Sequence, residues 1–225
     1  MSTTAHPHGR VPAPVAVPEF AKSAAQLAWR PRVVPGSGPV DLSAAEEAAT
    51  ALLIALGQPL NSTGMAETPR RLAQAYAEML TAEPFELTTF PNTEGYDELV
   101  LVEDIPVRSV CEHHLLSFTG RAHVGYLPRQ RILGLSKFAR VVDFHSRRAQ
   151  TQERLTQQIA EHLQDQLDPR NVGVVVEAEH SCMSMRGVRA AGTRTVTSTL
   201  FGTLRTDAAS RAEFLSLARG HRATP

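Results

Sequence analysis

The spacing of apolar residues predicts two helices in the first part of the chain. Residues 44–56 have a helix-forming composition, and Ser43 followed by Glu46 matches a capping box. A second helix is predicted to begin at Thr68 as its N-cap, and apolar residues then recur at helical spacing as far as Leu80. These two helices form a predicted N-terminal helical region.

From about residue 98 the pattern changes to short apolar runs that are typical of strands. Strands are predicted at 99–102, 105–110, 121–128, 173–179 and 195–204, and helices at 134–147, 151–167 and 210–219. Pairs of strands therefore precede and follow two helices. This order favours an α+β fold, in which an antiparallel sheet carries the helices.

The composition divides the chain into three parts. Residues 1–40 hold seven of the fifteen prolines and lack an amphipathic period, so we expect a flexible N-terminal arm. Residues 41–95 form the N-terminal helical region. Residues 96–225 form the domain that is expected to carry the chemistry.

The charge balance excludes a general affinity for polyanions. The chain has 23 basic and 23 acidic side chains, so no overall field attracts nucleic acid or a membrane surface. No apolar run is long enough to span a bilayer, and the N-terminus does not resemble a secretory signal. We therefore expect a cytoplasmic protein, in which the two cysteines stay reduced and serve a metal or a reaction.

Both cysteines have histidines close by. Cys111 and His114 have a short spacing that allows one turn of chain to supply two ligands, and Cys182 would be the third. Thiolate and imidazole are the ligands that zinc prefers, and a catalytic zinc site has three protein ligands and an open position. His113 and His180 would then be free to transfer protons near neutral pH.

Two other interpretations of the same residues stay open. Both cysteines could be small buried hydrophobic residues with incidental histidines. Alternatively, His113 or His180 could be a fourth ligand, which would make a closed structural zinc site.

A possible anion site lies at the start of the helix predicted at 134–147. Ser136 and Lys137 are in its first turn, and Arg140 lies on the same face as Lys137. Free N–H groups and the helix dipole favour an anion there. Arg186 follows Cys182 closely and would add a guanidinium group near the metal.

Glu153 lies in the first turn of the helix predicted at 151–167, with Gln152 before it. A glutamate at this position is usually a partner of the helix dipole, but it could instead accept two hydrogen bonds from a guanine edge. His123 and His145 are interpreted as structural histidines and receive no functional role.

Four motifs together resemble GTP cyclohydrolase I. They are Cys-Glu-His-His-Leu-Leu at 111–116, Gly-Leu-Ser-Lys-Phe-Ala-Arg at 134–140, Gln-Thr-Gln-Glu-Arg-Leu-Thr at 150–156 and His-Ser-Cys-Met-Ser-Met-Arg-Gly-Val-Arg at 180–189. The likeness covers roughly residues 43–218 in the right order and spacing. Several independent motifs are far more specific than any one of them alone.

The resemblance implies a fold, an assembly and a reaction. The fold is the tunnelling fold with an N-terminal helical extension. Five subunits join their sheets into a barrel, two rings form a homodecamer, and active sites lie between subunits. The implied reaction converts GTP to 7,8-dihydroneopterin triphosphate and formate by hydrolysis at C8 of the purine, as the first step of pterin and folate biosynthesis.

The resemblance also implies roles for individual residues. Cys111, His114 and Cys182 match zinc ligands, and His113 and His180 match proton-transferring histidines. Ser136 matches a residue that acts in ring closure, and Glu153, with Gln152 beside it, matches the contact for guanine. The residues that match triphosphate contacts are Lys137, Arg140, Arg186 and Arg71.

Two positions depart from the family pattern. Ser117 stands where the family usually has proline, and His145 where it usually has an aromatic residue. Neither is a matched catalytic position. Other functions remain as alternatives: a noncatalytic purine- or pterin-binding protein of this fold, a structural zinc protein, and a related enzyme that acts on another pterin or deazapurine.

Overall fold

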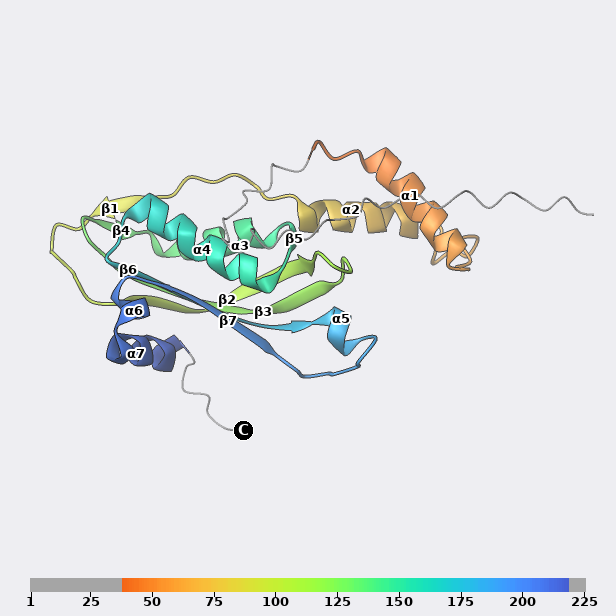
Figure 1. The fold of residues 1–225 in the computed structure, drawn as a ribbon. Helices are drawn as coiled ribbons and strands as arrows, with labels where there is room; N and C mark the ends of the chain where they lie inside the picture. Colours follow the sequence, from red (N-terminus) through yellow and green to blue (C-terminus); the bar gives the residue numbers. More distant parts are fainter. Residues whose placement is uncertain (1–37, 219–225) are drawn as a thin grey trace, which may run out of the picture. The chain divides into compact units, whose positions relative to one another are not determined.

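The computed structural model describes residues 38–218, so nearly all of the proline-rich arm expected at 1–40 lies outside the described residues. The elements in chain order are α1 (Leu42–Ala55), α2 (Thr68–Leu80), β1 (Thr89–Pro91), β2 (Val100–Cys111), β3 (Ser117–Leu127), β4 (Arg131–Leu133), α3 (Leu135–Ser146), β5 (Ala149–Gln150), α4 (Gln152–Leu167), β6 (Asn171–His180), α5 (Ser181–Ser184), β7 (Thr195–Phe201), α6 (Thr203–Thr206) and α7 (Ala208–Ala218) (Figure 1). The division into three parts stays a prediction.

The main sheet has the strand order β5-β2-β3-β6-β7. Strands β2, β3, β6 and β7 pair antiparallel, and the two-residue strand β5 pairs parallel with the end of β2. The runs predicted at 99–102 and 105–110 belong to one strand, because a register shift between Val102 and Ile105 keeps both halves paired with β3. The prediction of a mixed helix-and-sheet fold is confirmed.

Helices α3 and α4 cover one face of this sheet and form the main core with it (Figure 1). Phe118 and Tyr126 from β3, Phe138 from α3 and Ile159 from α4 are all fully buried there. Four-residue spacing along α4 places its apolar side chains on the face that meets the sheet. This core fixes the strand ends that carry the candidate ligands.

Helix α7 lies on the opposite face, where Phe214 is fully buried with Val175 in a second, smaller cluster. Phe214 lies directly over Gly173, and a β-carbon on Gly173 would come within 2.5 Å of the Phe214 ring. Glycine at this position therefore allows α7 to approach the sheet.

The starts of the first two helices differ from the sequence prediction. The N-cap of α1 is Asp41, whose carboxylate accepts from the N–H of Ala44 at 3.0 Å. The capping box predicted at Ser43 is therefore wrong, because an aspartate caps as well as a serine and allows the helix to begin earlier. Thr68 is likewise a helical residue of α2 and not its N-cap, which is Glu67.

Within residues 38–218, we find no helix with the length and hydrophobicity that a membrane crossing requires.

Candidate metal centre

Two parallel strand ends bring the predicted metal ligands together. Strands β2 and β6 are both antiparallel to β3, so they run in the same direction and their carboxyl ends lie at the same end of the sheet. Cys111 is the last residue of β2, and Cys182 lies in the short helix α5 that follows β6 directly. The ligand atoms of Cys111, His114 and Cys182 lie within 4.8 Å of one another.

The loop after β2 is fixed by its own backbone. The N–H of Cys111 donates to the carbonyl of Leu116 at 2.8 Å, and the N–H of Leu115 donates to the carbonyl of Cys111 at 2.8 Å. Leu115 takes a left-handed conformation with φ of 53°. This tight turn places the side chains of Cys111 and His114 on the same side.

Two neighbouring helices hold the same loop. Both guanidinium NH groups of Arg154, in the first turn of α4, bond the carboxylate of Glu112 at 2.5 and 3.1 Å. The bond from Arg154 lowers the pKa of Glu112, although burial opposes this shift. The hydroxyl of Tyr76 in α2 donates to the carbonyl of Leu115 at 2.9 Å. The sequence analysis did not identify Glu112 and Arg154, because their pairing joins residues that are 42 positions apart.

The donor set suits a soft or borderline transition metal. Two thiols and one imidazole match the preference of zinc for sulfur and nitrogen ligands. Burial raises the pKa of the Cys182 thiol, and so does the neighbouring Cys111. A cation between the two sulfur atoms would favour their thiolate forms. In the part of the chain that the structure describes, this group has three members, as a centre with an open position requires.

The two candidate proton-transfer histidines flank this group. His113 is exposed, and its Nδ1 lies 3.7 Å from the sulfur of Cys111. His180 ends β6 and is half-buried, and its ring stacks on Phe118 with the centroids 4.5 Å apart. Burial lowers the pKa of His180, while the charge of Glu153 acts in the opposite direction. Glu153 itself is exposed to solvent.

Gln152 points into the protein. It is 1% exposed, and its side-chain oxygen lies 2.8 Å from Nε2 of His180. Its side-chain nitrogen contacts the carbonyls of Val176 and Thr195 at 3.0 and 2.9 Å, and the hydroxyl of Thr197 at 3.2 Å. Gln152, which the sequence analysis places beside the guanine contact Glu153, is therefore a buried partner of His180 in this structure.

The candidate anion residues lie at the other end of a helix from the metal ligands. Ser136 and Lys137 open α3, whereas Ser146 at its end accepts from the hydroxyl of Ser109 at 2.7 Å, beside the end of β2. At 1.5 Å per residue, about 15 Å of helix separates Ser136 from Ser146. Arg140 lies one turn into the helix and is exposed. One chain therefore does not gather these residues around its own metal group.

The two other candidate arginines lie on the surface. Arg186 is exposed in the loop after α5, and its charge acts to lower the pKa of Cys182. Arg71 is exposed on α2. The structure brings Arg186 near the metal ligands, while Arg71 extends from a different element.

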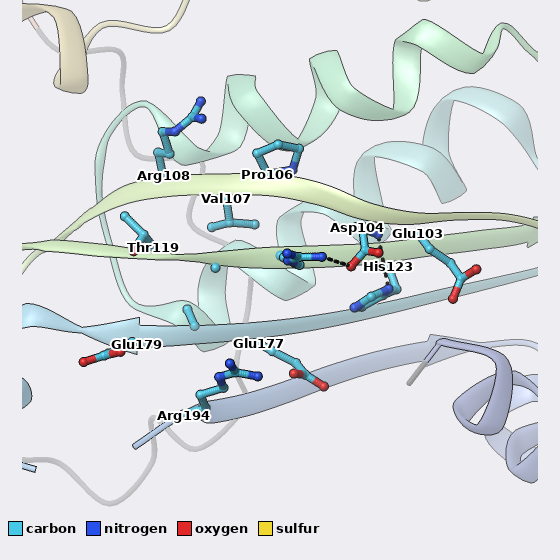
Figure 2. Close-up of a pocket in the computed structure, with 13 residues that line it drawn as sticks. Glu103, Asp104, Pro106, Val107, Arg108, Thr119, His123, Glu177, Glu179 and Arg194 are labelled. Atoms are coloured by element: carbon cyan, nitrogen blue, oxygen red, sulfur yellow. Dashed lines mark hydrogen bonds and ion pairs between the residues drawn. The ribbon is translucent and has the colours of Figure 1, made fainter. Parts of the chain in front are cut away.

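A cavity of about 600 Å³ lies away from these residues, on the sheet face that also carries α7 (Figure 2). Acidic and arginine side chains of β2, β3 and β6 line it, including an ion pair of Asp104 with Arg121 at 2.8 Å. His123 is 7% exposed, and its Nδ1 accepts from the backbone N–H of Asp104 at 3.4 Å. The cavity contains none of the candidate site residues, so we assign the site from the chemistry of the metal group.

Comparison with known proteins identifies one family and relatives that share its name. The profile of the family described as GTP cyclohydrolase I matches residues 45–219. The chain is 52% identical over 182 residues to a protein named GTP cyclohydrolase 1 from Mycolicibacterium gilvum, covering 79% of this chain and 90% of that protein. It is 54% identical over 185 residues to a protein of the same name from Streptomyces griseus subsp. griseus, covering 80% and 92% of the two chains.

Proposed function

Because the chain belongs to the GTP cyclohydrolase I family, we propose that it converts GTP and water to 7,8-dihydroneopterin triphosphate and formate. This reaction is the first step of pterin and folate biosynthesis. The observation that carries the proposal is the group of Cys111, His114 and Cys182, with His113 and His180 close to its members in the sequence. A noncatalytic binding protein would not need His113 and His180 beside such a group.

The metal that we propose is zinc, held by Cys111, His114 and Cys182. The gathering of one imidazole nitrogen and two sulfur atoms within 4.8 Å supports this assignment. When bound, zinc supplies a Lewis acid that makes water a nucleophile near neutral pH.

Proton transfer falls to His113 and His180. His180 has one ring nitrogen bonded to Gln152, which leaves Nδ1 as the nitrogen available to substrate. His113 is exposed beside the Cys111 sulfur, so a substrate can reach its ring. Two histidines of different exposure suit a reaction that must both protonate a leaving nitrogen and remove protons from water.

The proposed substrate contacts come from several elements: α2, the start of α3, the start of α4 and the loop after α5. Glu153 is an exposed carboxylate beside His180, as a contact for the N–H groups of guanine requires. The proposed triphosphate contacts are Lys137, Arg140, Arg186 and Arg71, and Ser136 is proposed to act in ring closure. We propose that a second chain supplies Ser136 and Lys137 to each site, because they open α3 about 15 Å along the helix from Ser146, which lies beside the end of β2.

We therefore propose an assembly in which the sheets of five chains join into a barrel and two rings form a decamer. Two features of the sheet support it. Strand β7 is an open edge, and β5 covers only the last two residues of β2, so both edges are available for pairing. Helix α1 and its C-cap Leu56 also expose apolar side chains: Leu52, Ile54 and Leu56 are each more than half exposed, as an unfilled subunit interface would be.

The test is turnover of GTP by the purified, zinc-loaded protein, with formate and the fluorescence of oxidised neopterin followed together. Both products should form, and both should be lost on chelation and return with zinc. Formate without neopterin would mean that the ring opens and does not close. Tight GTP binding with neither product would favour the noncatalytic binding protein.

One variant tests the proton-transfer role directly. His113→Ala should retain zinc and GTP and lower turnover by about 10²- to 10⁴-fold, because general acid–base catalysis contributes rate factors of that size. Zinc content and GTP affinity are the controls for intact structure. Turnover equal to the wild type would exclude His113 from the reaction.

A further inference from the structure

We infer that Gln152 is a positioning residue that holds the His180 ring in one orientation and one tautomer, with the proton on Nε2 and Nδ1 bare. This inference rests on the proposed function of His180. It gives the Gln152 side chain a different task from the substrate contact that the sequence suggests.

The surroundings of the Gln152 amide allow only one orientation of this group. Its nitrogen lies within 3.0 Å of two backbone carbonyls, from Val176 and Thr195, which only accept hydrogen bonds. The opposite orientation would place the amide oxygen against both carbonyls in a site that is 1% exposed. The nitrogen must therefore face the carbonyls, and the oxygen must face His180.

The amide oxygen of Gln152 determines which ring nitrogen of His180 carries the proton. An amide oxygen only accepts, so the bond of 2.8 Å to Nε2 requires a proton on Nε2 of His180. In the neutral ring, Nδ1 then has a free lone pair and is the nitrogen that can take a proton from a reacting group.

Phe118 restrains the plane of the His180 ring. The His180 ring stacks on Phe118 with an interplanar angle of 11°, and Phe118 is fully buried. Stacking fixes the plane, and the bond to Gln152 fixes the rotation within that plane. Both restraints come from the core, because Phe118 belongs to β3 and Gln152 opens α4.

The side chain of Gln152 has no free hydrogen-bonding group for a substrate. Its nitrogen already has three acceptors within 3.2 Å, and its oxygen is bonded to His180. A guanine base that bonded this amide would have to break a buried network. Selection of the base by side chains is therefore left to its exposed neighbour Glu153.

The main test is Gln152→Met, which keeps the length of the side chain and removes both hydrogen-bonding atoms. We expect kcat for formate release to fall by about 10- to 100-fold, as for other residues that orient a catalytic group, with KM for GTP changed less than about twofold. Gln158→Met is the matched control, because Gln158 is also a buried glutamine of α4 but bonds Gln150. It should keep kcat near the wild-type value.

A double-mutant cycle with His180→Ala separates positioning from direct substrate binding. If Gln152 acts through His180, Gln152→Met should have no further effect on kcat in the His180→Ala background. A rise in KM that persists in that background would overturn the inference and return Gln152 to substrate binding. Unchanged kcat in the single variant would overturn it too.

A measurement on the unaltered holoenzyme covers the case in which Gln152→Met does not fold. The ¹⁵N shifts of the imidazole, assigned by their loss in His180→Asn, should report a protonated Nε2 and an unprotonated Nδ1. A proton on Nδ1 with a bare Nε2 would overturn the inference. Wild-type protein that releases no formate would instead overturn the proposed function, and the NMR result would still decide the tautomer.

Discussion

Three consecutive side chains at the start of α4 serve three parts of the candidate site. Gln152 bonds His180, Glu153 is exposed beside that histidine, and Arg154 pairs with Glu112 in the loop of the proposed metal ligands. The N-cap Thr151 fixes this first turn, because its hydroxyl accepts from the N–H of Arg154 at 3.3 Å. At the scale of the residue, one helix start aligns the carboxyl ends of β2 and β6.

Removing Arg154 should therefore weaken metal binding although Arg154 is not a ligand. Arg154→Met leaves Glu112 without its partner and loosens the turn that aligns Cys111 and His114. We expect zinc affinity to fall by about 10- to 100-fold in competition with a chelator. Arg121→Met, which breaks the exposed pair with Asp104, is the control and should bind zinc as the wild type does. Equal affinity in both variants would contradict the role of Arg154.

A histidine pair outside the site makes stability depend on pH. Nε2 of His145 lies 3.1 Å from Nδ1 of His162, among the aromatic rings of Phe85 and Phe144. Burial, then the charges of His162 and Arg148, lower the pKa of His145 to about 3. The unfolded chain then binds more protons than the folded chain between pH 6.5 and 3, so stability is lost as the pH falls through this range.

His145→Phe should remove the contribution of His145 to this dependence, since phenylalanine does not titrate. Each pH unit below 6.5 costs the wild type roughly 1.4 kcal/mol at this one group. The wild type should therefore lose about 2 kcal/mol more than His145→Phe between pH 7 and pH 5. Urea unfolding at the two pH values measures the difference, and parallel losses in both proteins would contradict it.

At the scale of the element, the sequence predicts those helices and strands whose apolar residues form a repeating pattern. The helix with Leu155, Ile159 and Leu163 is predicted because its buried face repeats every four residues, and the long strands because apolar runs alternate with turns. Strand β5 has two residues, too few for any period, so only its pairing with β2 defines it. The bulge between Val102 and Ile105 was also out of reach, because it depends on the partner strand.

The contact between α7 and the sheet can be tested at Gly173. A methyl group in Gly173→Ala would lie against the Phe214 ring, which must shift to make room. We expect a loss of about 1–3 kcal/mol in the free energy of unfolding, as for other overpacked sites. Gly64→Ala is the matched control, since a β-carbon there meets nothing within 4 Å. Equal stability of the two variants would mean that α7 moves away without cost.

At the scale of the whole molecule, residue chemistry predicts the types of the candidate site residues, whereas only the resemblance to a known family implies that they are divided between subunits. The short spacing of Cys111 and His114 indicates a metal from sequence alone, because chemistry restricts the ligands of zinc to a few side chains. No spacing indicates that α3 places Ser136 and Lys137 at the end away from this group. That separation follows from the length of a helix packed on a sheet.

Dissociation of the proposed assembly should therefore separate metal binding from turnover. All three proposed ligands come from one chain, so zinc should stay bound when subunits part. Turnover should fall together with the oligomeric mass in a dilution series, since a lone chain lacks the anion end of a neighbouring α3. Light scattering and formate release at equal dilution measure both quantities. Full turnover by single chains would contradict the shared site.

The separation of the two ends of α3 also has a genetic consequence. In a cell with two alleles, one altered at Cys182 and the other at Lys137, neither chain supplies a complete site with copies of itself. A mixed ring of the proposed assembly would contain junctions where the unaltered metal group of one chain meets the unaltered start of α3 of its neighbour. Two such alleles should complement each other and allow growth in medium without pterin. Two alleles altered at the same end should not complement.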